Sequence, residues 1–479
     1  MISELKNGSI SLSEIEKMTG GKLVCSGISD AEIDRICTDS REASEGTLFA
    51  AIHGERTDGH LYIPRALENG CRAILAEKMP EGADGFDFAA VLAEDTVEAL
   101  GKIAEEYKKK NPCFTVGVTG SVGKTTTKEF IAAVLGRKFM TYKTEGNHNS
   151  VIGLPLSIME IPAGCGAAVL EMGMSGFGEI SSMTHAARPD IAVITNIGTS
   201  HMEMLGSREN ICRAKMEIAE GLAEDGILLL NGDEPLLRGA DKGGRKALYV
   251  SLENRDADFR AMNIRVEVKK TTFDLLWNGK VYSNIEMPVM GRHNVYAALF
   301  AFAVGTLCGM DENEIREGLS DFRSPGMRQN IYDAGGITLI EDCYNASPES
   351  MRSAINVLSE LSGHKNGART AALLGDMLEL GESSEKLHRE VGEYLARSGC
   401  RLLFAYGPMA EKIAESAVEN GMSPENVYVN REKGTPEKTG ELMLHALCEG
   451  DILLVKASRG MEAEKVIEYL KKHLSKIGK

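Results

Sequence analysis

Residues 113–126 read CFTVGVTGSVGKTT, and this stretch decides the fold of the middle of the chain. An apolar run leads into a glycine-rich loop, and a helical pattern follows to about Leu135. A glycine-rich loop between a strand and a helix binds phosphate, because its backbone N–H groups and the helix N-terminus face the anion. The stretch therefore predicts an ATP site formed by Gly120, Ser121, Val122, Gly123, Lys124, Thr125 and Thr126.

The loop departs in one place from the strict phosphate-loop pattern, G-x-x-x-x-G-K-[ST]. Val118 stands where the first glycine would be. A purely structural glycine-rich turn is the alternative, but it gives no reason for Lys124 and Thr125 to follow the last glycine directly. Lysine supplies charge to the phosphates and the threonine hydroxyl can bind Mg²⁺, so nucleotide binding is the better interpretation.

The rest of the middle segment has the pattern of a parallel sheet. Apolar runs at 166–172, 191–197 and 226–232 alternate with helical patterns, which is typical of strands joined by crossover helices. Residues 264–277 and 280–289 then flank Asn278-Gly279, a strong hairpin signal, so an antiparallel edge is predicted. A helix is expected from about Asn294.

Composition shifts divide the chain into three α/β domains. Pro112 ends a charged stretch, and glycine and proline recur at 324–330. Further apolar runs follow at 337–342, 370–376, 402–407 and 451–458. The predicted domains are a small N-terminal one, a central phosphate-loop domain with a mostly parallel sheet and a Rossmann-like C-terminal one, at 1–110, 111–323 and 324–479.

Charge and cysteine usage exclude several classes of protein. The formal net charge of −16 disfavours a nucleic-acid surface, which needs clustered Lys and Arg. The ten cysteines form no C-x-x-C pair, which argues against a disulfide framework or a structural zinc site. No signal peptide or membrane span is recognisable, so a cytoplasmic protein without membrane insertion is expected, and we expect a monomer.

Three residues beyond the loop are candidates for metal chemistry. Glu171 ends one apolar run and His201 follows the next, and the carboxyl ends of parallel strands face the ligand crevice. Alone, His201 would more often be a capping or core residue. Lys215 lies four residues after Ile211 and three before Ile218, on the inward face of the helical pattern at 208–222. Such a lysine either extends its head to water or is held near anions.

Taken together, these motifs resemble the Mur ligases of peptidoglycan synthesis over essentially the whole chain. Besides the loop, the matching segments in order are 39–41 (DSR), 54–60 (GERTDGH), 145–155 (EGNHNSVIGLP), 170–180 (LEMGMSGFGEI), 196–207 (NIGTSHMEMLGS), 213–218 (RAKMEI), 291–301 (GRHNVYAALFA), 325–329 (PGMRQ), 341–351 (EDCYNASPESM), 374–388 (LGDMLELGESSEKLH) and 455–464 (VKASRGMEAE).

The resemblance implies roles for individual residues. Thr125, Glu171 and His201 would serve two Mg²⁺ ions, with Lys215 carbamylated as a further ligand. Asn294 would contact the adenine end of ATP, and Arg328 and Asp342 its phosphates and ribose. The implied catalytic residues are Lys124, Glu171, His201, Lys215 and Arg328. The implied substrate-binding residues are Asp39, Ser40, Arg41, Asn147, Asn149, Asn345, Ser347, Ser458 and Arg459.

The resemblance also implies an activity. The segments at 342–351 and 374–388 resemble the branch that joins D-alanyl-D-alanine to UDP-N-acetylmuramoyl-tripeptide through an acyl phosphate, at the expense of ATP. The alternatives are a Mur ligase that adds a single amino acid, a ligase like folylpolyglutamate synthase, and a nucleotide-operated switch without ligase activity. The N-K-x-D guanine motif of a GTP switch is absent from the chain.

Overall fold

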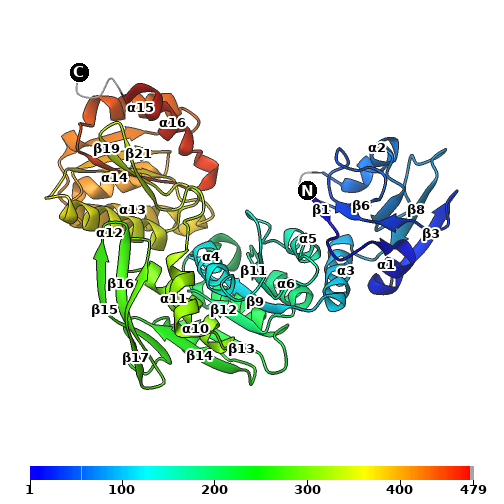
Figure 1. The fold of residues 1–479 in the computed structure, drawn as a ribbon. Helices are drawn as coiled ribbons and strands as arrows, with labels where there is room; N and C mark the ends of the chain where they lie inside the picture. Colours follow the sequence, from blue (N-terminus) through cyan, green and yellow to red (C-terminus); the bar gives the residue numbers. More distant parts are fainter. Residues whose placement is uncertain (55–56, 475–479) are drawn as a thin grey trace.

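The computed structural model describes residues 1–54 and 57–474. Three sheets follow one another along the chain, and Figure 1 shows them in a row from the N-terminal end to the C-terminal end. The mixed α/β class and the mostly parallel sheets were both predicted correctly. Residues 55–56, part of the motif at 54–60, lie outside the described residues. No helix in the described ranges is long and apolar enough to cross a lipid bilayer.

The first sheet has six strands, and its four middle strands run parallel. In spatial order the strands are β1 (Ile2–Glu4), β5 (Arg35–Cys37), β6 (Thr47–Ala50), β7 (Ala73–Ala76), β8 (Phe88–Leu92) and β3 (Lys22–Ser26). A small ladder joins β2 (Ile10–Ser11) and β4 (Glu32–Ile33), and the helices are α1 (Leu12–Thr19), α2 (Ile63–Glu68) and α3 (Thr96–Lys110).

Helix α3 joins this first unit to the central sheet. Its last turn carries three lysines, which favour a helix C-terminus, and its buried face includes Leu100 and Ile103. It packs against α5 (Gly153–Met159) and α6 (Glu179–Ala187), which cover one face of the central sheet. The buried Tyr107 hydroxyl donates to Gly8 O at 3.0 Å.

The central sheet has nine strands. In order they are β10 (Thr141–Lys143), β11 (Ala167–Glu171), β9 (Phe114–Thr119), β12 (Ile191–Ile194), β13 (Ile227–Asn231), β14 (Lys246–Ser251), β15 (Phe259–Glu267), β16 (Lys270–Trp277) and β17 (Lys280–Met287). Its remaining helices are α4 (Lys124–Leu135), α7 (Met202–Leu205), α8 (Arg208–Met216), α9 (Pro235–Gly239), α10 (Asn294–Leu307) and α11 (Glu312–Ser320).

Both faces are buried where the central sheet is built from the parallel strands β9, β11, β12 and β13. Val116 and Val169 pack on one side with α4 and α10, and Ala168 and Leu170 pack on the other with α5 and α6. Such two-sided burial explains why these strands are almost uniformly apolar. The carboxyl ends of β9, β11 and β12 therefore share one edge, where polar side chains can gather.

Two predicted elements of the central sheet were wrong in detail. Residues 264–277 form two strands, because the chain turns at Val268 and Lys269, and Lys269 has a φ of 69°. The edge is thus a three-stranded antiparallel meander, with the Asn278-Gly279 turn where it was predicted. The helix predicted over 208–222 ends at Met216 and continues only as a 3₁₀ turn, Glu217–Ala219.

The third sheet has six strands in the order β18 (Asn330–Ala334), β19 (Ile337–Glu341), β23 (Ile452–Lys456), β20 (Thr370–Gly375), β21 (Leu402–Tyr406) and β22 (Val427–Asn430). All but β18 are parallel. The helices are α12 (Pro348–His364), α13 (Ser384–Arg397), α14 (Ala410–Glu419), α15 (Pro436–Ala446) and α16 (Glu464–His473).

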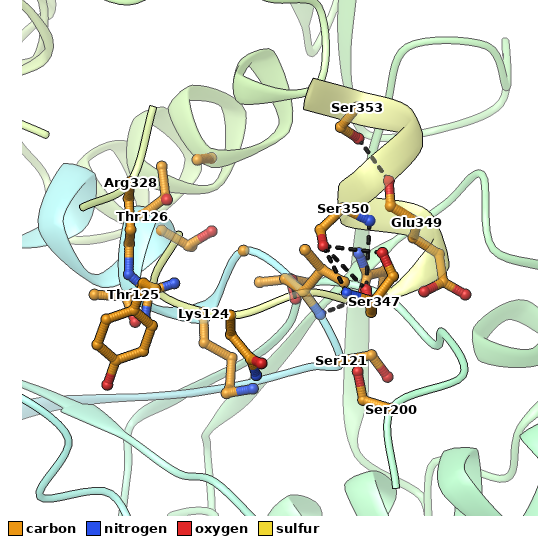
Figure 2. A pocket seen from close by; sticks show the side chains of 18 of the residues that line it. Ser121, Lys124, Thr125, Thr126, Ser200, Arg328, Ser347, Glu349, Ser350 and Ser353 are labelled. Atoms are coloured by element: carbon orange, nitrogen blue, oxygen red, sulfur yellow. Dashed lines mark hydrogen bonds between the residues drawn. The ribbon is translucent and has the colours of Figure 1, made fainter. Parts of the chain in front are cut away.

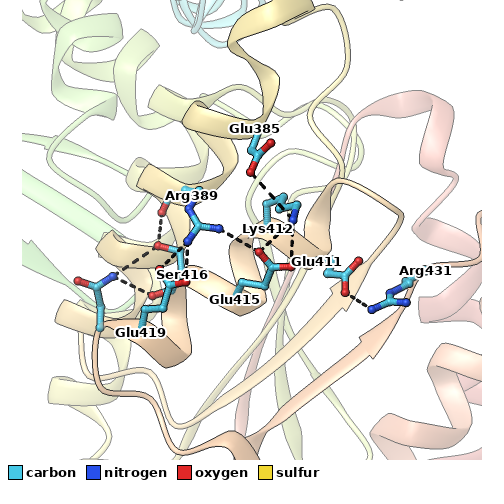
Figure 3. A network of polar contacts seen from close by, with 9 residues as sticks. Glu385, Arg389, Glu411, Lys412, Glu415, Ser416, Glu419 and Arg431 are labelled. Atoms are coloured by element: carbon cyan, nitrogen blue, oxygen red, sulfur yellow. Dashed lines mark hydrogen bonds and ion pairs between the residues drawn. The ribbon is translucent and has the colours of Figure 1, made fainter.

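An ion-pair network joins α13 to α14 on the outer surface (Figure 3). Arg389 bonds to Glu415 at 2.9 Å, and the Ser416 hydroxyl donates to Arg389 O at 2.7 Å. Water screens such exposed pairs, so they contribute little to folding stability. The apolar faces of the two helices provide the larger share of this contact.

Candidate active site

The glycine-rich loop is held in place by the loop that follows the neighbouring strand β12. The backbone N–H of Val122 donates to Asn196 Oδ1 at 2.9 Å, and Thr195 Oγ1 donates to Val122 O at 2.6 Å. Lys124 Nζ curls back onto Gly120 O at 2.8 Å. Burial lowers the pKa of Lys124, and the negative charge of Glu171 opposes that shift. The loop is thus preformed, with its cation beside a carboxylate.

Gly120 is required at its position for two reasons. Its φ is 146°, and a Cβ added there would lie 1.9 Å from Thr195 Oγ1. Gly120→Ala is therefore expected to displace the loop and to weaken ADP binding at least about tenfold, as measured by calorimetry. Gly101→Ala in α3 is the control, since its added Cβ meets only Ser182 Oγ at 4.0 Å. Equal ADP affinity in both variants would contradict the prediction.

Glu171 lies at the carboxyl end of β11 and is 2% exposed. Its Oε1 accepts from Thr125 Oγ1 at 3.2 Å and from Asn149 Nδ2 at 2.9 Å. Its Oε2 has no hydrogen bond within the described part of the chain and lies 3.6 Å from the Nζ of buried Lys128. A buried carboxylate oxygen without a hydrogen bond is suited to binding a cation.

Lys215 lies on α8 and is 1% exposed. Among the described residues its Nζ makes neither a hydrogen bond nor an ion pair. Burial, and then the positive charge of Lys124, lower the pKa of Lys215 far below its ordinary value. The lowered pKa favours the neutral amine, which is the form that reacts with CO₂. Lysine heads usually reach water instead, so this burial is unusual.

The opposite wall of the site belongs to the third sheet and the segment before it. The Lys456 ammonium is buried and donates to Asp342 Oδ2 at 2.7 Å and to Asn345 O at 3.1 Å. The guanidinium of Arg328 lies 4.0 Å from the centre of the Tyr344 ring. This wall therefore brings two cations to a site that already contains Lys124.

A group of amides marks one end of the site. Asn294 Nδ2 donates to Met290 O and to Gln329 Oε1, both at 2.9 Å. Burial lowers the pKa of the adjacent His293 to about 4, so its ring is neutral at pH 7. Neutral hydrogen-bonding groups of this kind suit a nucleobase better than a phosphate.

The two walls enclose one cleft of about 550 Å³ (Figure 2). The cleft brings together these residues singled out in the sequence: Ser121, Val122, Gly123, Lys124, Thr125, Thr126, Asn149, Glu171, His201, Asn294, Arg328, Asp342, Asn345 and Ser347. Gly120 and Lys215 are not among its lining residues. Asn147 is exposed outside it. Asp39, Ser40 and Arg41 lie in the first unit, where the Arg41 guanidinium holds the pKa of Asp39 well below its usual range.

Most of the residues proposed for the amine substrate have local structural partners. Ser347 Oγ caps α12 by accepting from Ser350 N, and Asn345 Oδ1 accepts from Ala346 N at 2.8 Å. Ser458 is buried, and its Oγ accepts from Leu378 N at 3.0 Å. Arg459 is exposed and pairs with Glu464 at 2.9 Å. Ser347 and Asn345 nevertheless line the cleft, whereas Ser458 and Arg459 do not.

Sequence reasoning missed several residues that line the cleft. They are Asn196, His293, Gln329, Tyr344, Glu349 and Lys456. Lys456 had a usable signal, because a lysine at the end of the apolar run 452–456 is unusual. Glu349 had no signal of its own beyond lying in the matching segment 341–351, since a glutamate in the first turn of a helix is common.

Comparisons with known proteins agree with this geometry. Three family models match the chain: "Mur ligase family, catalytic domain" at residues 32–108, "Mur ligase middle domain" at 118–305 and "Mur ligase, glutamate ligase domain" at 327–459. The UDP-N-acetylmuramoyl-tripeptide–D-alanyl-D-alanine ligase of Bacillus subtilis is 37% identical, covering 95% of this chain and 97% of that protein. The Escherichia coli ligase of the same name is 32% identical over 97% of this chain and 99% of its own length.

Solved structures give the same result. Crystal structure I of MurF from Acinetobacter baumannii has a TM-score of 0.86 at 27% identity, covering 97% of this chain and 99% of that one. MurF from Thermotoga maritima, solved in complex with ADP, has a TM-score of 0.80 at 31% identity, covering 92% and 98%. The family models match over most of the chain, and the curated relatives match nearly all of it. The chain belongs to the Mur ligase family.

Proposed function

We propose that this protein is an ATP-dependent ligase of peptidoglycan precursor synthesis, which joins UDP-N-acetylmuramoyl-tripeptide to D-alanyl-D-alanine. The main support for this proposal is the cleft around the glycine-rich loop. Lys124 and Glu171 line one wall of this cleft, and Arg328 lines the opposite wall. Full-length similarity to ligases of that name supports the choice of substrates. The ADP complex of the Thermotoga maritima relative supports ATP as the nucleotide.

In the proposed reaction, the γ-phosphoryl group of ATP passes to the terminal carboxylate of the tripeptide. The resulting acyl phosphate is attacked by the dipeptide amine, which forms the peptide bond and releases phosphate. The chain contributes mainly position and charge: Lys124 and Arg328 neutralise the phosphates, and the Lys124-bearing loop directs its N–H groups at them. No covalent bond between enzyme and substrate is needed.

The donors present fit magnesium. No group of three or more His, Cys, Asp or Glu side chains is gathered in residues 1–54 and 57–474, so an ion here would rely partly on hydroxyl and phosphate oxygens. Thr125 and Glu171, with its unbonded buried oxygen, would hold one Mg²⁺. His201 and carbamylated Lys215 would hold a second. Bound Mg²⁺ supplies charge neutralisation to the transferred phosphoryl group.

We further propose that each of the three domains binds a different substrate. Residues 1–110 would bind the UDP-sugar end of the substrate through Asp39, Ser40 and Arg41, and residues 111–323 would bind ATP. Asn147 and Asn149 would contact the tripeptide. Residues 324–479 would bind the dipeptide, with Asn345 and Ser347 nearer the reacting groups than Ser458 and Arg459, because only the first two line the cleft.

Phosphate release from Mg²⁺-ATP tests the function. With UDP-N-acetylmuramoyl-tripeptide present, release is expected with D-alanyl-D-alanine and to fall to background with D-alanine alone or without an amine. Omitting the tripeptide should also abolish release, because no carboxylate is then available. Release with a single amino acid would place the enzyme in another branch of the family, and amine-independent release would favour a nucleotide switch.

A further inference from the structure

His201 and Glu379 face each other across the junction of the central and third sheets. His201 follows β12 and Glu379 follows β20, and His201 Nδ1 lies 2.9 Å from Glu379 Oε2. Both residues have left-handed backbone conformations, with φ of 65° and 64°. Residues with a Cβ rarely adopt this conformation, and it persists where the surroundings enforce it, which is common at functional sites.

The segment that carries Glu379 is tightly fixed. Met377 N donates to Nε2 of the buried His388 at 2.9 Å, and Leu378 N donates to Ser458 Oγ at 3.0 Å. The neighbouring Gly381 allows close packing on α7, since a Cβ there would lie 3.1 Å from Glu203 Cα. These contacts therefore fix the loop that places the Glu379 carboxylate next to His201.

A second contact holds the same junction. Glu349 Oε1, from the first turn of α12, accepts from Thr199 N at 3.0 Å and from Thr199 Oγ1 at 3.1 Å. Two carboxylates of the third domain thus bind the short segment 199–201 at both ends. The position of His201 depends on this docking, because its two flanking contacts come from the other wall of the cleft.

The contact with Glu379 also influences which nitrogen of the His201 ring carries the proton. A carboxylate accepts hydrogen bonds, so in the neutral form of the ring this contact favours the proton on Nδ1 and leaves the lone pair on Nε2. His201 lines the cleft beside the glycine-rich loop. Histidines that bind metals commonly donate their second ring N–H to a carboxylate in this way.

We propose that Glu379 is a positioning residue, which fixes the tautomer and orientation of His201 so that Nε2 can bind the divalent ion only while the third domain is docked on the central one. The inference rests on the proposed function, since it assumes that metal and nucleotide share this cleft. The metal site would then depend on two domains, because the central domain supplies His201 and the third domain supplies Glu379. The exposure of the Glu379 side chain alone would not suggest this role.

Mn²⁺ binding in the presence of ADP tests the metal side of this inference. By electron paramagnetic resonance of free Mn²⁺, Glu379→Ala is expected to bind the ion about tenfold more weakly than the wild type. Glu379→Gln, whose amide oxygen can still accept from Nδ1, should lose less. Glu382→Gln is the matched control, because Glu382 is an exposed carboxylate of the same loop. Unchanged Mn²⁺ affinity in Glu379→Ala would overturn the proposal.

The ring itself gives a second readout that needs neither metal nor turnover. With ¹⁵N-labelled histidine, and the His201 signals identified by their loss in His201→Ala, the wild type is expected to show the Nδ1–H tautomer. Glu379→Ala should shift the population toward Nε2–H, and Glu379→Gln should restore Nδ1–H. An unaltered tautomer in Glu379→Ala would contradict the inference even if Mn²⁺ affinity fell.

These readouts separate the inference from the proposed function. A wild type that binds Mn²⁺ and ADP but releases no phosphate with the dipeptide would overturn the function and leave the role of Glu379 to be decided by its variants. A wild type that binds no Mn²⁺ in the presence of ADP would overturn the metal role of His201.

Discussion

Lys124→Ala is expected to lower the rate of dipeptide-dependent phosphate release roughly 1,000-fold, the largest effect of any single substitution in the cleft. The Lys124 head lies on the glycine-rich loop, 2.8 Å from Gly120 O, where the phosphates of ATP would arrive. Because charge builds up on the transferred group, a positioned ammonium stabilises the transition state more than the bound substrate. The loss should therefore fall mainly on kcat, with a smaller rise in the KM for ATP.

Lys246→Ala provides the control for this variant. Lys246 begins β14 of the same sheet, is exposed, and its side chain makes neither a hydrogen bond nor an ion pair with another described residue. The Lys246→Ala variant should retain full activity, since it also removes one positive charge but at a position outside the cleft. If Lys124→Ala kept more than about a tenth of the wild-type kcat, the phosphoryl group would have to be neutralised chiefly by other groups, with Arg328 the first to examine.

The features that could be predicted from the sequence are mostly those formed by residues within one continuous segment. The strand-to-helix turn at Gly120 to Thr126 was predicted correctly, because it depends on local backbone conformation. The position of Glu171 at the cleft was expected because parallel strands end at a common edge. The turn at Val268 and Lys269 was missed because neither residue is a usual turn former, although Lys269 adopts a positive φ there.

What could not be predicted depends on how distant segments meet. The bond from Val122 N to Asn196 Oδ1 depends on how the loop after β12 folds against the glycine-rich loop, and the motif at 196–207 does not reveal that contact. The pairing of Lys456 with Asp342 requires β19 and β23 to be neighbours, and strand order is not readable from apolar runs. Contacts between domains, such as that of Glu379 with His201, are harder still to predict, because they depend on how the domains pack and not on the sequence near either residue.

Lys215→Met is expected to separate stability from activity. Methionine matches the length of the lysine stem and has no head that needs hydrogen bonds, so it suits a site that is 1% exposed. In CO₂-depleted buffer the variant should melt about 2–4 °C higher than the wild type. Its dipeptide-dependent activity should nevertheless fall about 100-fold, because no carbamate can form to bind the second ion.

The stability gain should depend on pH. The pKa of Lys215 is lowered in the folded state, so between that value and the ordinary one near 10.5 the unfolded chain binds a proton that the folded chain does not. Wild-type stability therefore rises with pH in this window, and the advantage of Lys215→Met should shrink toward pH 10. Lys246→Met, at an exposed site, should show no such dependence.

The proposed carbamate would be observed directly. In that reaction the unprotonated amine of Lys215 would attack CO₂, form an N–C bond and lose one proton, so the residue would change from an uncharged group to an anion. Wild-type protein under ¹³CO₂ should show a carbamate signal by NMR that Lys215→Met lacks, and bicarbonate should stimulate only the wild type. A wild type without the signal, but inactivated by Lys215→Met, would mean that the amine itself serves catalysis. A buried lysine that destabilises the fold would then be retained for its lone pair or its charge, and the second metal site would have to be built from His201 and substrate oxygens alone.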